Sequence, residues 1–96
     1  MKAYVIVNVA IRDPERYKDY IKAATPTVSA HGGKYIVRGG RAELLEGSVA
    51  VHRVVVLEFP SYAQAKGWYD SPEYREALAI RQACSTGDLI LVEGTP

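Results

Sequence analysis

Several residue types are scarce in this chain, and each scarcity excludes something. Cys84 is the only cysteine among 96 residues, so no disulfide can form within the chain and no set of thiolates can hold zinc or an iron–sulfur cluster. This usage is typical of a reducing cytoplasm, where we expect the protein to reside. No apolar run approaches the roughly 20 residues that span a bilayer, so we expect no membrane partner.

A surplus of charge of either sign is also missing. Twelve lysines and arginines face eleven acids, which gives a formal net charge of +1, and the basic residues are scattered rather than clustered. Nucleic-acid binding is therefore disfavoured. The balance of 48% hydrophobic and 24% charged residues is that of a folded globular protein. We predict one domain over residues 1–96.

Four runs rich in β-branched and aromatic residues predict strands. They cover residues 2–10, 34–38, 51–59 and 88–93. The first is short and is followed by Asp13 and Pro14, where a signal peptide would need a small-residue cleavage site. We therefore interpret it as a strand and not as a signal peptide.

Cap residues predict the helices between these strands. Asp13 before a proline predicts a helix start, and the helix should run to about His31, where a glycine pair ends it. Pro26 lies inside this helix and lacks an amide donor, so a kink or broken turn is expected there. Ser61 and Ser71 predict caps of two further helical pieces, over 61–69 and 72–84, with Gly87 as a breaker before the last strand.

The resulting order, βαββαβ, is that of a ferredoxin-like α+β fold with a four-stranded antiparallel sheet. Right-handed crossovers place both helical segments on one face of the sheet. Alternate residues of a strand point to opposite faces, yet Val5 and Ile6, or Leu89 and Ile90, are apolar on both. A sheet with water on one side would alternate. We expect a second copy to cover the bare face, giving a two-fold dimeric α+β barrel.

Four segments resemble a widespread bacterial family of small proteins described only as a domain of unknown function. They are AHGGKYIVRGG (30–40), RVVVLEFPS (53–61), WYDSPEYREAL (68–78) and DLILVEG (88–94). That family resembles the dimeric α+β barrel superfamily, with its antibiotic-biosynthesis monooxygenases, muconolactone isomerase, ethyl-tert-butyl-ether-degradation proteins and haem-binding relatives. The resemblance implies a dimer but no particular reaction, since the superfamily hosts many.

Two arginines are candidates for anion binding. Arg38 and Arg53 lie on strands that the topology makes neighbours, and two guanidinium groups can hold a carboxylate or enolate through bidentate hydrogen bonds. The alternative is that each is paired with an acid such as Glu46 or Glu58, or is solvated at a strand end.

The two histidines are candidate catalytic residues, because only histidine has an ordinary pKa near neutrality. His31 precedes two glycines at a predicted helix end, where a capping role competes with catalysis. His52 begins a strand and is expected to be exposed. Neither belongs to a metal-binding motif, so we predict no metal site and no cofactor.

Aromatic residues and one amide complete the candidate ligand-binding set. Seven tyrosines accompany a single phenylalanine, and Tyr35, Trp68, Tyr69 and Tyr74 could form an aromatic pocket with a polar end. They could equally cover a thin core with their hydroxyls in water. Asn8 is the polar residue within the first apolar strand; it could orient a ligand carbonyl or satisfy a neighbouring group.

Together these residues predict a homodimer that binds a small, partly apolar or anionic organic molecule between sheet and helices. If it is an enzyme, it would be a cofactor-independent one of monooxygenase-like or isomerase-like type. The competing hypotheses are a non-catalytic dimeric scaffold and a ligand sensor.

Overall fold

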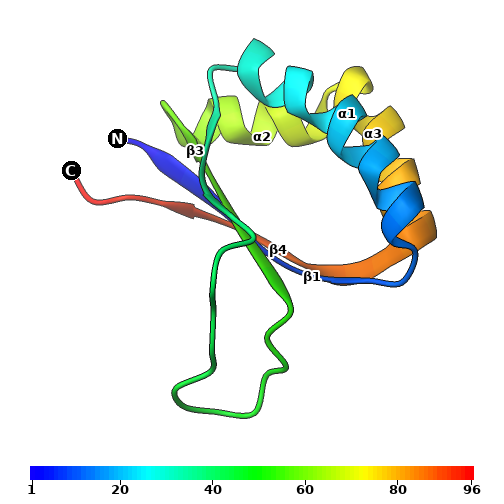
Figure 1. Cartoon of the computed structure of the whole chain (residues 1–96). Helices are drawn as coiled ribbons and strands as arrows, with labels where there is room; N and C mark the ends of the chain where they lie inside the picture. Colours follow the sequence, from blue (N-terminus) through cyan, green and yellow to red (C-terminus); the bar gives the residue numbers. More distant parts are fainter.

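The computed structural model describes residues 1–96 and has one antiparallel sheet with helices on a single face (Figure 1). The strands are β1 (Ala3–Ile11), β2 (Lys34–Arg38), β3 (Arg53–Phe59) and β4 (Ser85–Glu93), and the helices are α1 (Pro14–Ala30), α2 (Tyr62–Asp70) and α3 (Pro72–Cys84). The order across the sheet is β2-β3-β1-β4, with every neighbouring pair antiparallel. The predicted ferredoxin-like α+β fold is confirmed. None of the helices combines the length and apolar character needed to cross a membrane.

The helices begin where the cap residues predict. The side chains of Asp13, Ser61 and Ser71 each accept a hydrogen bond from a backbone amide three residues on, which satisfies one of the free donors of a first helical turn. At the other end of α1, His31 is the C-cap and Gly32 follows with a φ of 78°, a conformation that glycine adopts without steric cost.

The course of α1 and the starts of two strands differ from the prediction; strand β3 begins at Arg53 rather than at residue 51. Helix α1 continues through Pro26 without a break, and the hydroxyls of Thr25 and Thr27 donate to helix carbonyls beside it, at 2.7 and 2.6 Å. Strand β4 begins at Ser85 and runs through Gly87, which was expected to be a breaker. A Cβ at Gly87 would collide with the backbone of Asn8, so this glycine permits close approach of β1 rather than ending pairing.

The core lies between the sheet and the helices. Its centre is Trp68, which is 1% exposed and packs against Tyr74 and Phe59 with ring centroids 4.1 and 5.4 Å away. The indole Nε1 donates to the Thr27 hydroxyl at 3.0 Å, so its polar group is satisfied. The aromatic cluster thereby ties α2 to α1, α3 and β3.

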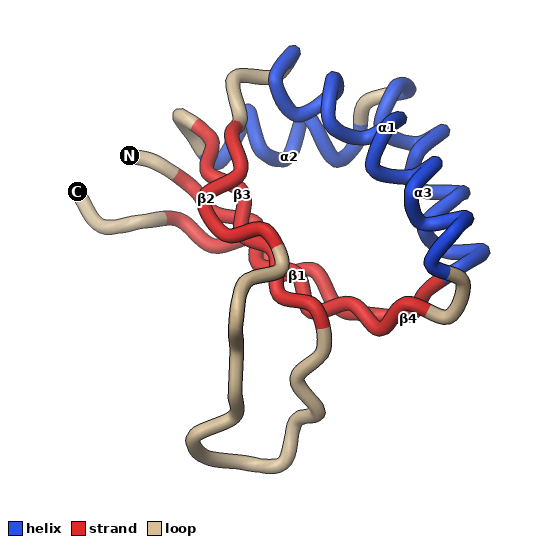
Figure 2. Tube along the Cα trace, in the orientation of Figure 1, coloured by secondary structure: helices blue, strands red, loops and turns tan.

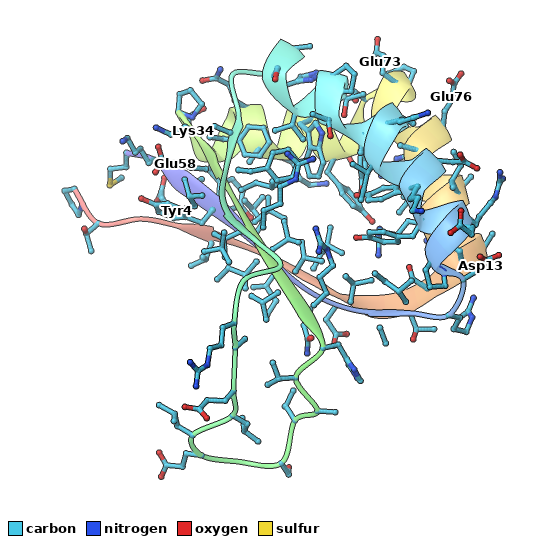
Figure 3. The ribbon with its side chains drawn as sticks, viewed as in Figure 1. Tyr4, Asp13, Lys34, Glu58, Glu73 and Glu76 are labelled. Atoms are coloured by element: carbon cyan, nitrogen blue, oxygen red, sulfur yellow. The ribbon has the colours of Figure 1, made fainter.

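The other face of the sheet is bare and largely apolar. Strand register places Val37, Val56, Ile6 and Ile90 in one row across all four strands, and Ile6 and Ile90 are 38% and 58% exposed. At one end of this face Glu58 bridges two lysines, with Tyr4 beside it (Figure 3). The alternation expected of a solvated face is missing here.

The loop over residues 39–52 extends away from the body on the side opposite the helices (Figure 2). It exposes Leu44, Leu45 and Val49 to solvent. Its returning end is fixed to β1 by Asn8, whose amide donates to the Ala50 carbonyl and accepts from the His52 amide, both at 2.9 Å. The loop therefore adds apolar surface to the bare side.

Candidate functional site

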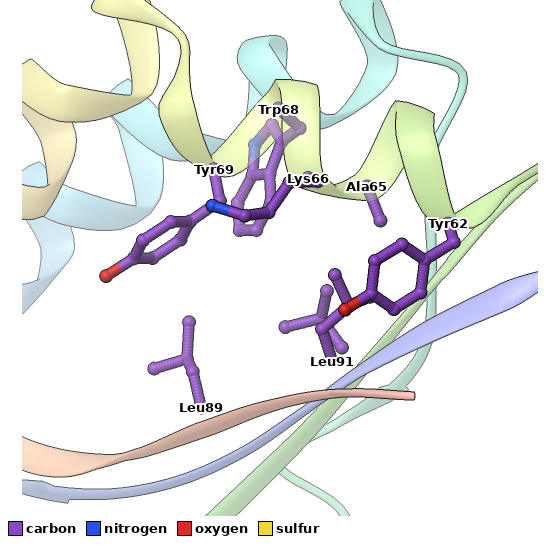
Figure 4. Close-up of a pocket in the computed structure, with 8 residues that line it drawn as sticks. Tyr62, Ala65, Lys66, Trp68, Tyr69, Leu89 and Leu91 are labelled. Atoms are coloured by element: carbon purple, nitrogen blue, oxygen red, sulfur yellow. The ribbon is translucent and has the colours of Figure 1, made fainter. Parts of the chain in front are cut away.

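A cavity of about 380 Å³ lies between α2 and strands β1 and β4. Figure 4 shows the rings of Tyr62 and Tyr69 on either side of the space, with Leu89 and Leu91 below them on the sheet side. Trp68 closes its inner end, and the one charged wall residue, Lys66, forms an ion pair with Asp70. The remaining wall is formed by Val5 and Ala65. Such a space suits an apolar or aromatic group.

A second, narrower hollow of about 30 Å³ lies between α1 and the sheet and shares Trp68 and Leu89 with the first. We call the two together the sheet-helix cleft. The polar wall of the hollow consists of Tyr17, Tyr20, Tyr35, Arg38 and Arg53. Two predicted arginines and one predicted tyrosine therefore meet in one place, at the helix-covered face of β2 and β3.

Neither arginine is neutralised by an acid. Arg38 stacks on the Tyr35 ring at 4.1 Å and donates to the Thr25 hydroxyl at 3.1 Å. The Arg53 guanidinium lies 6.0 Å from the centroid of the Tyr17 ring, and its Nε is buried without a hydrogen-bond partner. The alternative pairing with Glu58 is not found, because that carboxylate binds Lys2 and Lys34 on the opposite face. The cleft wall therefore carries positive charge with no counter-charge.

Gly39, the first residue after β2, makes room for this arrangement. Its φ is 71°, and a Cβ at this position would collide with the Arg53 guanidinium. Glycine is therefore required here for two reasons: the backbone has a positive φ, and the Arg53 guanidinium occupies the space of a Cβ.

The tyrosines of the cleft are linked and strongly desolvated. The Tyr20 and Tyr74 hydroxyls are 3.0 Å apart. Burial raises the pKa of Tyr20 and of Tyr17 above the ordinary value, and the neighbouring Arg53 offsets only part of the effect on Tyr17. These hydroxyls are therefore protonated donors near neutral pH.

Raised tyrosine pKa values predict loss of stability in alkali. The unfolded chain releases its tyrosine protons near pH 10, whereas Tyr17 and Tyr20 retain theirs in the fold. The free energy of unfolding is therefore unaffected by these groups below about pH 10 and falls as the pH rises above it. In a near-ultraviolet titration of tyrosinate, Tyr20→Phe should shrink only the step that coincides with unfolding. A smaller step in the folded protein would contradict this assignment.

The structure keeps the other predicted site residues out of the cleft. Asn8 and His52 lie on the bare side, where the Asn8 amide is occupied by the loop. His31 is at the end of α1, and its Nδ1 lies 2.9 Å from the Thr27 carbonyl, so that nitrogen carries the proton and donates. Tyr74 is fully buried within the helix layer and lines neither cavity; it packs behind the cleft residues Trp68, Tyr69 and Tyr20. No histidine lines the cleft.

Sequence reasoning missed several wall residues. Tyr17, Tyr20 and Ile21 of α1 line the hollow but were not among the candidate residues, because apolar and aromatic residues on one helix face ordinarily serve packing. Lys66 had no distinguishing signal.

No group of three or more His, Cys, Asp or Glu side chains comes together as a metal-binding set.

Comparisons with known proteins place the chain among ferredoxin-like proteins. No curated protein matches it. It is similar to a protein of unknown function from Rhodopseudomonas palustris, with a TM-score of 0.79 and 26% identity, covering 99% of this chain and 83% of that chain. SnoaB, a cofactor-independent oxygenase from Streptomyces nogalater, has a TM-score of 0.71 and 9% identity, with 99% and 94% covered. A dimeric ferredoxin-like protein of unknown function from Thermobifida fusca YX has a TM-score of 0.60 and 20% identity, with 96% and 88% covered.

The last two likenesses show the fold alone. A family model, by contrast, matches almost the whole length, over residues 2–95. The chain belongs to that family, DUF1330, which is described as a domain of unknown function.

Proposed function

We propose that the protein is a homodimer that binds a small, partly apolar organic anion in the sheet-helix cleft of each subunit. The observation that carries this proposal is Arg53, a cation at the cleft wall with a buried, unpaired Nε and no acid partner. Arg53 is half-buried, but a donor such as its Nε that is removed from water without a partner costs free energy. An anionic ligand would supply the missing charge.

The rest of the wall defines the ligand. Arg38 adds a second guanidinium, which can hold a carboxylate by two parallel hydrogen bonds. Beyond the arginines, the adjoining cavity is apolar and flanked by the rings of Trp68 and Tyr69. An aromatic or enolisable acid fits this combination of one charged end and one apolar end.

The dimer part of the proposal rests on the bare face. A row of four apolar side chains crosses it, and the loop over residues 39–52 adds exposed leucines on the same side. Exposed apolar surface of this continuity marks an interface. The similar Thermobifida fusca protein is described as dimeric, which supports the same arrangement here.

The enzymatic form of the proposal is a monooxygenase-like or isomerase-like activity without a cofactor. Its support is the fold shared with SnoaB, which is described as a cofactor-independent oxygenase. Arg38 and Arg53 would stabilise the carboxylate or enolate oxygen of the substrate. The Tyr17 and Tyr20 hydroxyls, kept protonated by their raised pKa values, are nearby hydrogen-bond donors for that oxygen, and neither histidine lines the cleft.

A thermal-shift screen tests the cleft. An aromatic carboxylate at about 100 times its Kd should stabilise the parent protein by about 2.7 kcal/mol, which corresponds to roughly 10 °C or more in Tm for a chain of this size. Arg53→Gln should remove this shift. The matched control is Arg41→Gln, which changes an exposed loop arginine and should retain it.

The neutral amide of the same acid should give little stabilisation, because the guanidinium groups then face no charge. A shift that is equal in parent and Arg53→Gln would contradict the cleft assignment. If no compound in a panel of carboxylates, phenols and quinone-like aromatics shifts the Tm, the non-catalytic scaffold would be favoured.

A further inference from the structure

A third arginine, Arg81, is buried without a hydrogen-bond or ion-pair partner; it does not line the hollow that holds Arg38 and Arg53, although its charge acts on Tyr17 and Tyr20 of that hollow. Arg81 lies in the last turn of α3 and is 6% exposed. Its Nε is fully buried and unpaired, and its guanidinium takes part in none of the side-chain hydrogen bonds, ion pairs or cation–π contacts of the chain. Arginine remains protonated at all physiological pH values. The Nε of a cationic side chain is therefore buried without a partner, and no acid neutralises the charge.

Helix capping does not explain this burial. A cation in the last turn normally interacts with the free carbonyls of the helix end. Here Arg12 has that role, because it donates to the Gln82 and Ala83 carbonyls at 3.5 and 3.2 Å. The Arg81 side chain donates a hydrogen bond to neither of them.

No acid is placed to pair with Arg81 either. Glu73 and Glu76 of the same helix are exposed and point outward (Figure 3). Asp88 of β4 is opposite Asn8, so it belongs to the bare face. The remaining carboxylates in ion pairs all bind other cations on the surface.

Arg81 borders an open cavity of about 450 Å³ between α3 and the first half of β4. The other wall residues are Tyr69, Gln82, Ser85, Thr86, Gly87 and Leu89. The Ser85 hydroxyl donates to the Arg81 carbonyl at 2.6 Å. The side chains of Gln82 and Thr86 have no partner within the protein and can donate to a ligand.

We infer that Arg81 is the anion-recognising residue of a second subsite, which takes the carboxylate of an organic acid whose apolar body lies on Tyr69 and Leu89. One guanidinium matches one carboxylate in charge and in its paired hydrogen bonds. A phosphate dianion would need a second cation, and the wall of this cavity holds none. The subsite shares the apolar wall residues Tyr69 and Leu89 with the cleft, but its anion-binding residue is distinct from Arg38 and Arg53, so substitution of each arginine tests each anion site separately.

The test is a titration of the full-length protein with sodium benzoate, in a buffer without other carboxylates or phosphate, followed by the arginine Nε–Hε NMR signals. The Arg81 signal is identified by its loss in Arg81→Met. Benzoate should shift it saturably, whereas benzamide should not. Arg81→Gln should weaken the site by roughly ten- to a hundredfold, the usual value of a charge-assisted hydrogen bond. Arg16→Gln, which removes an exposed α1 arginine, should bind as the parent does.

Fold stability provides a second readout. If Arg81 is an uncompensated cation, Arg81→Met should not lower Tm in anion-free buffer, and it should abolish the Arg81-dependent part of the stabilisation by benzoate. The inference is overturned if the Arg81 signal is unmoved by benzoate, if benzamide moves it equally, or if Arg81→Met destabilises the protein and retains full benzoate binding.

Arg53→Gln separates the two sites. It should leave the Arg81 response intact, even where it removes the response of the cleft. Loss of both responses in Arg53→Gln would mean one shared site and would overturn the inference. Benzoate binding that depends on Arg81 but not on Arg53 would support the second subsite. The same result would remove support for the proposed cleft ligand.

Discussion

Trp68→Ala is expected to lower the free energy of unfolding by about 3–5 kcal/mol. The side chain is 1% exposed and packs between Phe59 and Tyr74, so truncation leaves a cavity that rigid neighbours cannot fill. It also leaves the buried Thr27 hydroxyl without its indole donor. Small domains are stable by only about 5–15 kcal/mol in total, so this one change removes a large share.

Chemical denaturation followed by circular dichroism measures this loss. The control is Tyr62→Ala on the same helix, where the side chain is 45% exposed and the expected cost is much smaller. Trp68→Phe should fall between the two, since it keeps most of the ring packing. Equal losses for Trp68→Ala and Tyr62→Ala would show that the aromatic cluster does not organise the core.

Ile6→Lys is expected to convert the proposed dimer into a monomer. Ile6 lies in the central strand β1, between Val56 and Ile90 on the bare face. In a two-fold dimer built on this face, each substitution brings two lysines into one interface, and such juxtaposition of like charges costs several kcal/mol. A loss of about 4 kcal/mol raises the dissociation constant roughly a thousandfold.

Sedimentation velocity or light scattering measures the molar mass directly. Tyr62→Lys is the matched control, because it places the same charge on an exposed residue of the helix side. A parent protein that is monomeric at all concentrations, or an Ile6→Lys protein that stays dimeric, would remove the bare face as the interface. Circular dichroism of Ile6→Lys distinguishes dissociation from unfolding.

The fold could be predicted from the sequence because its signals are local. Asp13, Ser61 and Ser71 have the chemistry of N-caps, and the strands have β-branched residues throughout. The boundaries that differed depend on neighbours instead. Gly87 breaks a helix in isolation, yet here the backbone of β1 approaches it too closely for any side chain.

The candidate site was predictable only in part. Alternation divides a strand into two faces but does not say which face the helices cover when both are apolar. Arg53 and Arg38 were correctly grouped, because neighbouring strands bring them together. Asn8 was assigned to the cleft, but it lies on the other face of its strand. Arg81 was missed because a cation in a last helical turn has an ordinary explanation, and only the position of its guanidinium removes that explanation.

Arg38 is the last residue of β2 and Arg53 is the first residue of β3, so the projecting loop is bounded at its two ends by the two guanidinium-bearing residues of the cleft. Any force on the loop, including contact with a partner subunit, acts on the backbone that carries both. If the proposed ligand and the proposed subunit contacts favour the same arrangement of this backbone, occupancy of the cleft and the contacts of the loop would be thermodynamically linked, and the influence would be reciprocal. A ligand that draws the arginines together would tighten the association of subunits by the same factor by which association tightens the ligand.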